Sequence, residues 1–216
     1  MPYLIRRILF ALLVRPVVLL IIGLNLRGRR ELPQSGPAVI VANHNSHLDT
    51  LVLLSLLGPK AFRVARPVAA SDYFTQTRWL NWMCFGLLNA IGIDRTSGAA
   101  ATMAQLQNAL ERGEILILYP EGTRGEPEAL QELKGGVAHL ARSRPGLPIF
   151  PVFMHGLGKA LPKGDRVLVP FICDVFCGKA LHWNGKSCRD FTRQLSAFFE
   201  ASRAALPPGC RPEEAA

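Results

Sequence analysis

Beyond Pro37, short apolar runs rich in β-branched residues alternate with longer stretches in which apolar residues recur at helical spacing. The runs have the length of buried strands, and the stretches between them are long enough for crossover helices. This alternation is typical of α/β proteins, in which helices connect parallel strands and cover the sheet. We therefore expect a mostly parallel, twisted sheet flanked by helices.

The expected elements follow from these patterns. We expect strands at residues 38–42, 62–65, 115–119, 148–153 and 167–176. We expect helices at residues 47–57, 77–89, 99–112, 130–142 and 187–206, with Gly113 as the C-cap of the third. At about 150 residues per domain, a chain of 216 residues supports one compact α/β domain, at residues 31–206. Residues 207–216 are rich in proline and charge and are expected to form a flexible tail.

Residues 1–30 precede this domain and contain a long apolar segment at residues 8–26. The segment is long enough to span a bilayer, but Arg15 and Pro16 lie near its middle. A mid-span arginine costs about 2.5 to 3.5 kcal/mol on insertion scales, and the proline removes a helical hydrogen bond. We therefore expect two apolar half-helices that lie in one leaflet and anchor the protein to the membrane. The alternatives are a single spanning helix and a cleaved signal peptide.

The charge of the chain indicates an anionic partner. Twenty-five Lys and Arg against sixteen Asp and Glu give a net charge of +9. Six of the arginines lie beside or within the apolar segment: Arg6, Arg7, Arg15, Arg27, Arg29 and Arg30. This arrangement favours an acidic phospholipid surface as the partner. It argues against nucleic acid, because the basic residues are not interleaved with aromatic ones as in a stacking groove.

The cysteines indicate a reducing compartment. Cys84, Cys173, Cys177, Cys188 and Cys210 are odd in number and include no C-x-x-C pair. This pattern predicts neither a disulfide framework nor a zinc site, and we interpret the residues as reduced thiols in the cytosol. Together with the expected anchor, it predicts a protein bound to the cytoplasmic face of the inner membrane.

Five aromatic residues gather between positions 73 and 85, namely Tyr73, Phe74, Trp79, Trp82 and Phe85. Their i, i+3 spacing is typical of packing in a helical core. Trp and Tyr also concentrate at the boundary between membrane and water, which is compatible with a second amphipathic patch resting on lipid. The sequence leaves both interpretations open.

The first expected strand leads directly into residues 43–49 (NHNSHLD). Ser46 and Asp49 have the spacing of a capping box, which places His44 in the loop before the helix, where its ring can fold back toward Asp49. A carboxylate that accepts a hydrogen bond from one ring nitrogen leaves the other nitrogen as a base. Imidazoles, with a pKa of about 6.5, suit proton removal from a hydroxyl at neutral pH. The alternative is that Asp49 only caps the helix and that His44 is an incidental polar residue.

Two other kinds of chemistry have less support. His44, His47 and Asp49 could be combined into a metal site, but the histidines straddle the expected N-cap instead of sharing a helix face, and no further ligand cluster follows. We therefore expect no metal. The chain has no G-x-S-x-G segment, so a serine hydrolase would lack its nucleophile.

Three further segments carry groups suited to binding an anion. Asp94 and Arg95 follow a short apolar stretch, and the strand expected at residues 115–119 leads into residues 120–125 (PEGTRG). Free backbone amides and a planar guanidinium group match phosphate oxygens. Lys134 lies soon afterward, at a helix entry rich in small residues. Each segment alone is more often an ordinary turn, but most lie at expected strand ends, where ligands of parallel sheets collect.

Taken in order, these blocks resemble the glycerolipid acyltransferase family, which includes the lysophosphatidic acid acyltransferases. The matching segments are NHNSHLD, IDR, YPEGTR and IFPV, and the resemblance covers about residues 38–155. The H-x4-D spacing alone would be a weak signal, whereas its combination with E-G-T-R is a strong one.

The resemblance implies that His44 is the base acting on an acceptor hydroxyl, oriented by Asp49. It implies an acyl thioester on CoA or acyl carrier protein as the donor, with no cofactor. It also implies a set of residues that hold a glycerol phosphate group: Arg95, Glu121, Gly122, Thr123 and Arg124. We add Lys134 to this set as a further candidate.

The expected reaction is acylation of the sn-2 hydroxyl of 1-acylglycerol 3-phosphate, a lysophospholipid, to give phosphatidic acid at the membrane. The chain departs from the family pattern at Tyr119, where Phe is usual, at Gly125, where Ser is frequent, and at Gly92 in the second block. These departures leave open another lysolipid acceptor, either amino-acid-containing or glycosylated. The non-enzymatic alternative is a basic peripheral membrane or nucleic-acid binder in which the blocks are structural.

Overall fold

The computed structural model describes residues 2–46, 48–71, 81–122, 130–160 and 171–207. Within these residues, seven strands form one sheet in the order β1-β7-β6-β2-β5-β3-β4. The strands are β1 (Ile22–Arg27), β2 (Ala38–Ala42), β3 (Ala65–Ala70), β4 (Ile91–Ile93), β5 (Ile115–Leu118), β6 (Ile149–His155) and β7 (Phe171–Cys177).

The helices of the described residues flank this sheet. The α-helices are α1 (Tyr3–Leu9), α2 (Arg15–Ile21), α3 (Leu48–Leu56), α4 (Pro59–Val64), α7 (Gly98–Glu111), α8 (Gly136–Ser143), α9 (Leu157–Ala160) and α10 (Cys188–Ala204). The π-helices are η1 (Phe10–Val14) and η3 (Trp82–Leu87), and the 3-10 helices are η2 (Arg29–Glu31) and η4 (Arg95–Ser97).

The sheet is mostly parallel, as expected. β2 pairs in parallel with β5 and β6, and β3 pairs in parallel with β4 and β5. β7 is antiparallel to β6, and β1 runs parallel to β7. Five strands therefore end at the same edge of the sheet, and the loops that follow them gather there: β2, β3, β4, β5 and β6.

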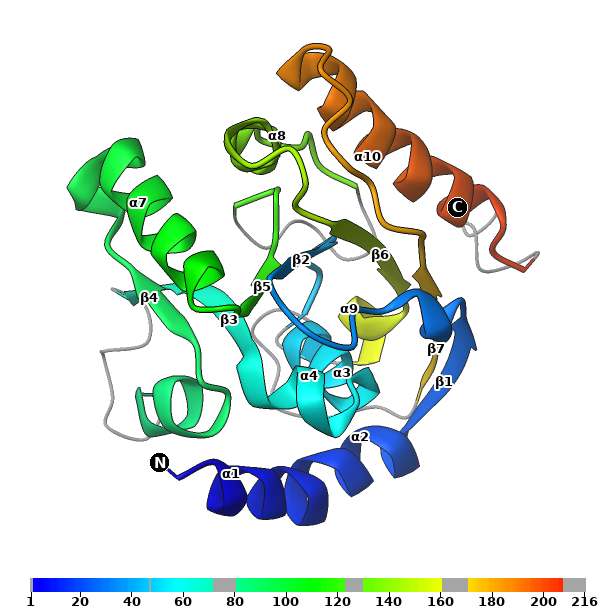
Figure 1. Cartoon of the computed structure of the whole chain (residues 1–216). Coiled ribbons are helices and arrows are strands. Elements are labelled where there is room, and N and C mark those ends of the chain that lie inside the picture. The colour runs from blue at the N-terminus through cyan, green and yellow to red at the C-terminus, as the bar shows by residue number, and fades with distance from the viewer. Residues whose placement is uncertain (1, 47, 72–80, 123–129, 161–170, 208–216) are drawn as a thin grey trace.

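Helices cover the sheet on both faces, as Figure 1 shows. Along β2, the side chains of Ala38, Ile40 and Ala42 pack into one apolar cluster and those of Val39 and Val41 into the other, and all are fully buried. The first cluster includes residues of α2, α3 and α4, and the second includes residues of α7, α8 and α10. A strand buried on both faces explains why this run is continuously apolar.

Several expected elements are confirmed. β2 has the expected bounds, and β5, β6, α3, α7 and α10 each lie within a few residues of the expected ones. Gly113 follows Arg112, the C-cap of α7, and has a φ of +74°, the left-handed conformation of a helix-ending glycine. At the start of α10, the hydroxyl of Ser187 accepts the N–H of Asp190 at 3.1 Å. These are features that local spacing and capping chemistry specify.

The expected strand at residues 62–65 is wrong, because this segment is the end of α4 and β3 begins only at Ala65. Pro59 occupies the first turn of α4, where its missing N–H costs nothing. The helix expected from residue 130 begins only at Gly136, since the preceding residues return to the edge of the sheet, where Lys134 N–H donates to the Pro120 carbonyl at 2.9 Å.

The helical segment expected at the N-terminus is only partly helical. Residues 3–21 form α1, η1 and α2 in succession, with the π-helical turn η1 just before Pro16. A proline clashes with the carbonyl four residues earlier, and the wider π turn accommodates it. Residues 22–27 form β1 instead of continuing the helix, because pairing with β7 satisfies their backbone groups. Throughout the described part of the chain, no helix combines the length and apolar character needed to span a bilayer.

Candidate active site

The loops after β2 and β5 meet at the edge of the sheet where these neighbouring strands end. The loop after β2 carries His44 and leads into α3, and the loop after β5 begins with Tyr119 and carries Glu121. Asn43 fixes the first loop, because its side-chain amide donates to the Met154 carbonyl and accepts the Met154 N–H, both at 2.8 Å. The site is therefore tied to three adjacent strands.

His44 and Asp49 face each other, with Nδ1 of the imidazole 2.8 Å from Oδ2 of the carboxylate. The same Oδ2 accepts the backbone N–H groups of Asn45 at 2.7 Å and Ser46 at 2.9 Å. The Asp49 side chain is only 1% exposed, whereas that of His44 is 19% exposed. The carboxylate is thus fixed in the interior, and the imidazole is oriented with Nδ1 toward Asp49 and Nε2 away from it.

Burial is the main electrostatic influence on Asp49. It raises the pKa of this carboxyl, and the hydrogen bond and charge of His44 act against the rise, together with the two backbone N–H groups. The arrangement is that of a histidine–acid pair, in which the acid orients the imidazole and stabilises its protonated form.

The ring of Tyr119 stacks on the imidazole of His44, with ring centroids 4.0 Å apart and planes inclined by 20°. The phenol oxygen lies 2.7 Å from Oγ1 of Thr50, the residue after Asp49 on α3. Burial and the negative charge of Asp49 raise the pKa of Tyr119 well above its ordinary value, so the phenol is neutral. Sequence reasoning noted Tyr119 only as a departure from the family pattern and missed this contact.

Glu121 and Lys134 border the same site. The Glu121 side chain is buried, and burial and the charge of Asp49 raise its pKa from 4.5 to about 7. The N–H of His44 partly offsets this rise without forming a well-aligned hydrogen bond to either carboxylate oxygen. Gly122 has a φ of +78°, and a side chain there would meet Nζ of Lys134. The structure thus brings together three of the residues expected to bind substrate: Glu121, Gly122 and Lys134.

Residues 23–155 match the acyltransferase family. The chain belongs to the acyltransferase family. Every candidate residue from His44 to Lys134 falls inside the matched range. The family expected from the sequence blocks is therefore confirmed.

Relatives of this chain come from distant organisms. The chain is 28% identical over 156 residues to the 1-acyl-sn-glycerol-3-phosphate acyltransferase alpha of Homo sapiens, covering 71% of this chain and 53% of the relative. It is 32% identical over 120 residues to a probable 1-acyl-sn-glycerol-3-phosphate acyltransferase of Mycoplasma pneumoniae, covering 55% of this chain and 44% of the relative. The chain spans about half the length of the curated relatives it matches.

The acyltransferase fold is also that of a solved structure, the 1-acyl-sn-glycerophosphate acyltransferase PlsC of Thermotoga maritima. The TM-score is 0.73 at 19% sequence identity, and the likeness covers 94% of this chain and 81% of PlsC. The likeness in fold therefore extends over nearly the whole chain.

The structure describes the other residues expected in the site less completely. Thr123 and Arg124 lie outside the described residues, as does His47. The backbone of Arg95 begins η4, after β4, while its side chain is outside what the structure describes. At about 4.8 Å per strand, the end of β4 lies about 14 Å along the sheet from the end of β2. Asp94 accepts the N–H and hydroxyl of Thr96 and so caps the η4 turn.

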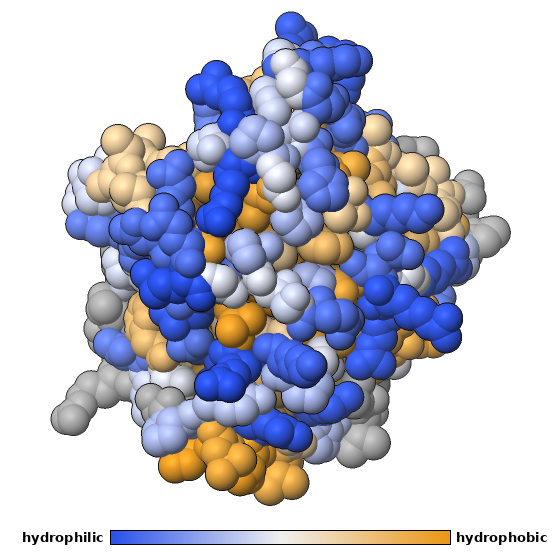
Figure 2. Space-filling view, viewed as in Figure 1, coloured by the Kyte–Doolittle hydropathy of each residue, from blue (hydrophilic) through white to orange (hydrophobic). Residues whose placement is uncertain are grey.

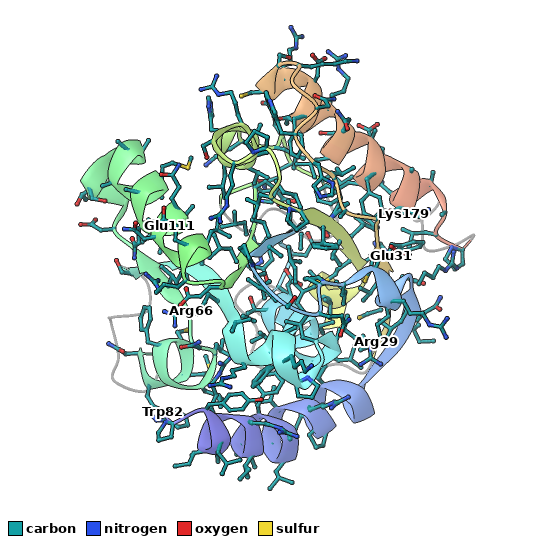
Figure 3. All side chains as sticks on the ribbon, in the orientation of Figure 1. Arg29, Glu31, Arg66, Trp82, Glu111 and Lys179 are labelled. Carbon is teal, nitrogen blue, oxygen red and sulfur yellow. The ribbon has the colours of Figure 1, made fainter. Side chains whose placement is uncertain are left out.

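Within the residues that the structure describes, no group of three or more His, Cys, Asp and Glu side chains is arranged to hold a metal ion. Of the five aromatics between positions 73 and 85, Trp82 and Phe85 are described and belong to η3. Trp82 is 49% exposed and lies beside α1 (Figure 3), whereas Phe85 is partly buried. Tyr73, Phe74 and Trp79 lie outside the described residues.

Proposed function

We propose that this protein transfers an acyl group from a thioester to a hydroxyl of a lysophospholipid, with His44 as the general base. The observation that carries the proposal is the 2.8 Å contact between His44 and the buried Asp49. With Nδ1–H held by the carboxylate, Nε2 takes the proton of the acceptor hydroxyl. The oxygen attacks the thioester carbonyl, the thiolate leaves, and the imidazolium returns its proton to that thiolate. No covalent bond to the enzyme forms in this scheme.

We infer that the acceptor is the sn-2 hydroxyl of 1-acylglycerol 3-phosphate and that the product is phosphatidic acid. Support comes from the names of the relatives, several of which are 1-acyl-sn-glycerol-3-phosphate acyltransferases. The phosphate needs positive groups near the base, and Lys134 is an exposed cation beside Gly122. Arg95 and Arg124 remain predicted partners of the same phosphate. The donor is acyl-CoA or acyl carrier protein.

We further propose that residues 3–21 anchor the protein in one leaflet of the membrane, at the cytoplasmic face of the inner membrane. Six large apolar side chains of α1, η1 and α2 are 46 to 69% exposed: Leu4, Ile5, Ile8, Leu12, Leu13 and Val17. Figure 2 shows the apolar patch that this segment forms at one end of the molecule. Arg7 and Arg15 are exposed on the same segment, where anionic headgroups would attract them.

The anchor segment is fixed to the body of the protein. Arg6 is buried, its guanidinium lies 4.3 Å from the centre of the Phe62 ring, and its Nε donates to the Leu87 carbonyl at 3.0 Å. Burial lowers the pKa of Arg6 to about 10, which leaves it charged at neutral pH. The exposed Trp82 next to α1 would extend the lipid contact, because indole rings favour the membrane boundary.

The reaction is tested by product identification. The purified protein is offered a mixture of lysolipids with acyl-CoA or acyl carrier protein thioesters, and the products are identified by mass spectrometry. We expect phosphatidic acid from 1-acylglycerol 3-phosphate. Acylation of an amino-acid-containing or glycosylated lysolipid instead would replace the acceptor and keep the chemistry. Failure to consume either thioester with any lysolipid would refute acyl transfer.

The base is tested by His44→Ala. Because general-base catalysis contributes about 10²- to 10⁴-fold, we expect turnover to fall by at least about 100-fold, with an unchanged melting temperature and unchanged vesicle binding. His182→Ala removes an exposed histidine as the matched control and should retain full activity. A folded His44→Ala protein with activity close to that of the wild type would show that another group removes the proton.

A further inference from the structure

A single hydrogen bond does not fix the plane of an imidazole. Asp49 holds His44 through Nδ1, but the ring can still tilt about that contact, and a tilt moves Nε2 on the opposite side of the ring. The reaction needs Nε2 within hydrogen-bond distance of the acceptor hydroxyl. A second contact, against the face of the ring, is therefore needed to define where the base points.

Tyr119 provides that second contact. Its ring lies nearly parallel to the imidazole at a centroid distance of 4.0 Å. Stacking at this distance blocks tilting toward one side and leaves the edge of the imidazole free. When His44 takes up a proton, the positive charge also develops over the electron-rich face of the phenol ring, which stabilises it.

Tyr119 is in turn held by α3. Its hydroxyl and Oγ1 of Thr50 are 2.7 Å apart, and Thr50 follows Asp49 directly in the chain. Two consecutive residues of one helix thus hold the imidazole, Asp49 through its edge and Thr50 through the aromatic ring on its face. A phenylalanine could stack on His44 but could not form this tether to Thr50.

We propose that Tyr119 is a positioning residue for acyl transfer, which fixes the plane of the His44 imidazole so that Nε2 faces the acceptor hydroxyl, and that Thr50 anchors it. This inference rests on the proposed role of His44 as the base. Tyr119 acts through His44 and exchanges no proton with substrate.

Three variants separate the ring from its tether. Tyr119→Leu removes the aromatic face, Tyr119→Phe keeps the face and removes the tether, and Thr50→Val removes the tether from the other side. Steady-state kinetics on the full chain give kcat and KM for each variant, and thermal melting reports folding. Phe199→Leu, which removes a buried aromatic ring from α10 in the opposite apolar cluster, is the matched control for lost packing.

We expect kcat of Tyr119→Leu to fall by about 10- to 100-fold, because small displacements of a catalytic group cost up to about 100-fold. Both KM values should change by less than about 2-fold, since an effect on the reaction step alone leaves substrate binding unchanged. Tyr119→Phe should restore kcat to within about 3-fold of the wild type, and Thr50→Val should resemble Tyr119→Phe. Phe199→Leu should lower the melting temperature with kcat retained.

Three outcomes would overturn the proposal. The first is wild-type kcat in folded Tyr119→Leu, and the second is a rise in KM with kcat retained, which would make Tyr119 a wall of the substrate site. The third is a Tyr119→Phe variant as slow as Tyr119→Leu while Thr50→Val keeps the wild-type kcat, which would assign a chemical role to the hydroxyl. His44→Ala separates this inference from the proposed function: if that variant stays active, the base assignment itself fails, whatever Tyr119 does.

Discussion

At the scale of single residues, the site places two buried carboxyl groups beside one imidazole. One oxygen of Asp49, Oδ2, accepts the His44 ring and two backbone N–H groups, whereas Oδ1 is buried without a hydrogen-bond partner among the described residues. Glu121 has no comparable set of donors, and its pKa is raised to about 7. Burial raises the pKa of both carboxyl groups, but hydrogen-bond donors act against the rise at Asp49, whereas Glu121 is left with a proton to lose near neutral pH.

Glu121 makes the stability of the fold depend on pH. A raised pKa means that the folded state favours the protonated carboxyl. The stabilisation that Glu121 adds to the free energy of unfolding is therefore fully present below pH 4.5 and is lost as the pH rises through about 7. We therefore expect Glu121→Gln to gain stability over the wild type as the pH rises across this window, by about 1 to 2 kcal/mol at pH 8. Urea unfolding at pH 5 and pH 8 measures this difference.

The control for this prediction is Glu132→Gln, in which an exposed carboxyl is replaced. Its free energy of unfolding should follow that of the wild type at both pH values. An equal free-energy difference between Glu121→Gln and the wild type at pH 5 and pH 8 would contradict the raised pKa. The comparison within one background removes the common titration of the histidines.

At the scale of secondary-structure elements, the exposed apolar face of α1, η1 and α2 is the proposed site of lipid contact. Burial of a leucine side chain is worth about 1.5 to 3 kcal/mol. We expect Leu12→Ser combined with Leu13→Ser to weaken binding to vesicles of phosphatidylglycerol and phosphatidylcholine by at least about 10-fold, or about 1.4 kcal/mol. Vesicle co-sedimentation measures the change.

The control for the Leu12 and Leu13 variant introduces two serine hydroxyls on a different helix, α7. Ala100→Ser with Ala101→Ser alters two exposed residues of α7 and should bind vesicles as the wild type does. Undiminished binding of the Leu12 and Leu13 variant would assign the lipid contact to another surface. Its melting temperature should equal that of the wild type, because both leucines are more than half exposed.

At the scale of the whole molecule, the N-terminal segment is part of the fold as well as the proposed membrane anchor. β1 pairs with β7 along six residues and forms one edge of the sheet, and Phe10, Val18 and Ile22 are buried in the core. Removal of this segment would expose an unpaired strand edge and an apolar surface. The proposed anchor and the α/β domain are therefore joined through a common core.

We expect a variant that lacks residues 1–30 to lose cooperative thermal unfolding and to aggregate, because it has lost an edge strand and three core side chains. Circular dichroism melting and size-exclusion chromatography check this outcome. A soluble, monomeric variant with a melting temperature near that of the wild type would show that the segment is dispensable for folding. The substitutions at Leu12 and Leu13 are therefore the better test of membrane binding.

Local sequence was sufficient for the features whose parts lie close together in the chain. The apolar run of β2, the helix caps and the pairing of His44 with Asp49 follow from spacings of five residues or fewer. The helix α4 was mistaken for a strand, because a short run such as AFRVA fits both periodicities when few residues are available. The prediction of an anionic partner and of an N-terminal anchor also came from the sequence, through the net charge and the place of the arginines beside the apolar segment.

The tertiary structure alone decided which distant segments became neighbours. Thr50 and Tyr119 are 69 residues apart and Asn43 and Met154 are 111 apart, yet each pair is in hydrogen-bond contact. The strand β1 is another case, since its pairing with β7 makes residues 22–27 extended where their apolar character alone suggested a helix. The spacing of apolar residues specifies which face of a helix or strand is buried. The order of strands in the sheet specifies which other residues pack against that face. The local sequence therefore specified the pair of His44 and Asp49, and only the fold placed the aromatic ring of Tyr119 against the imidazole.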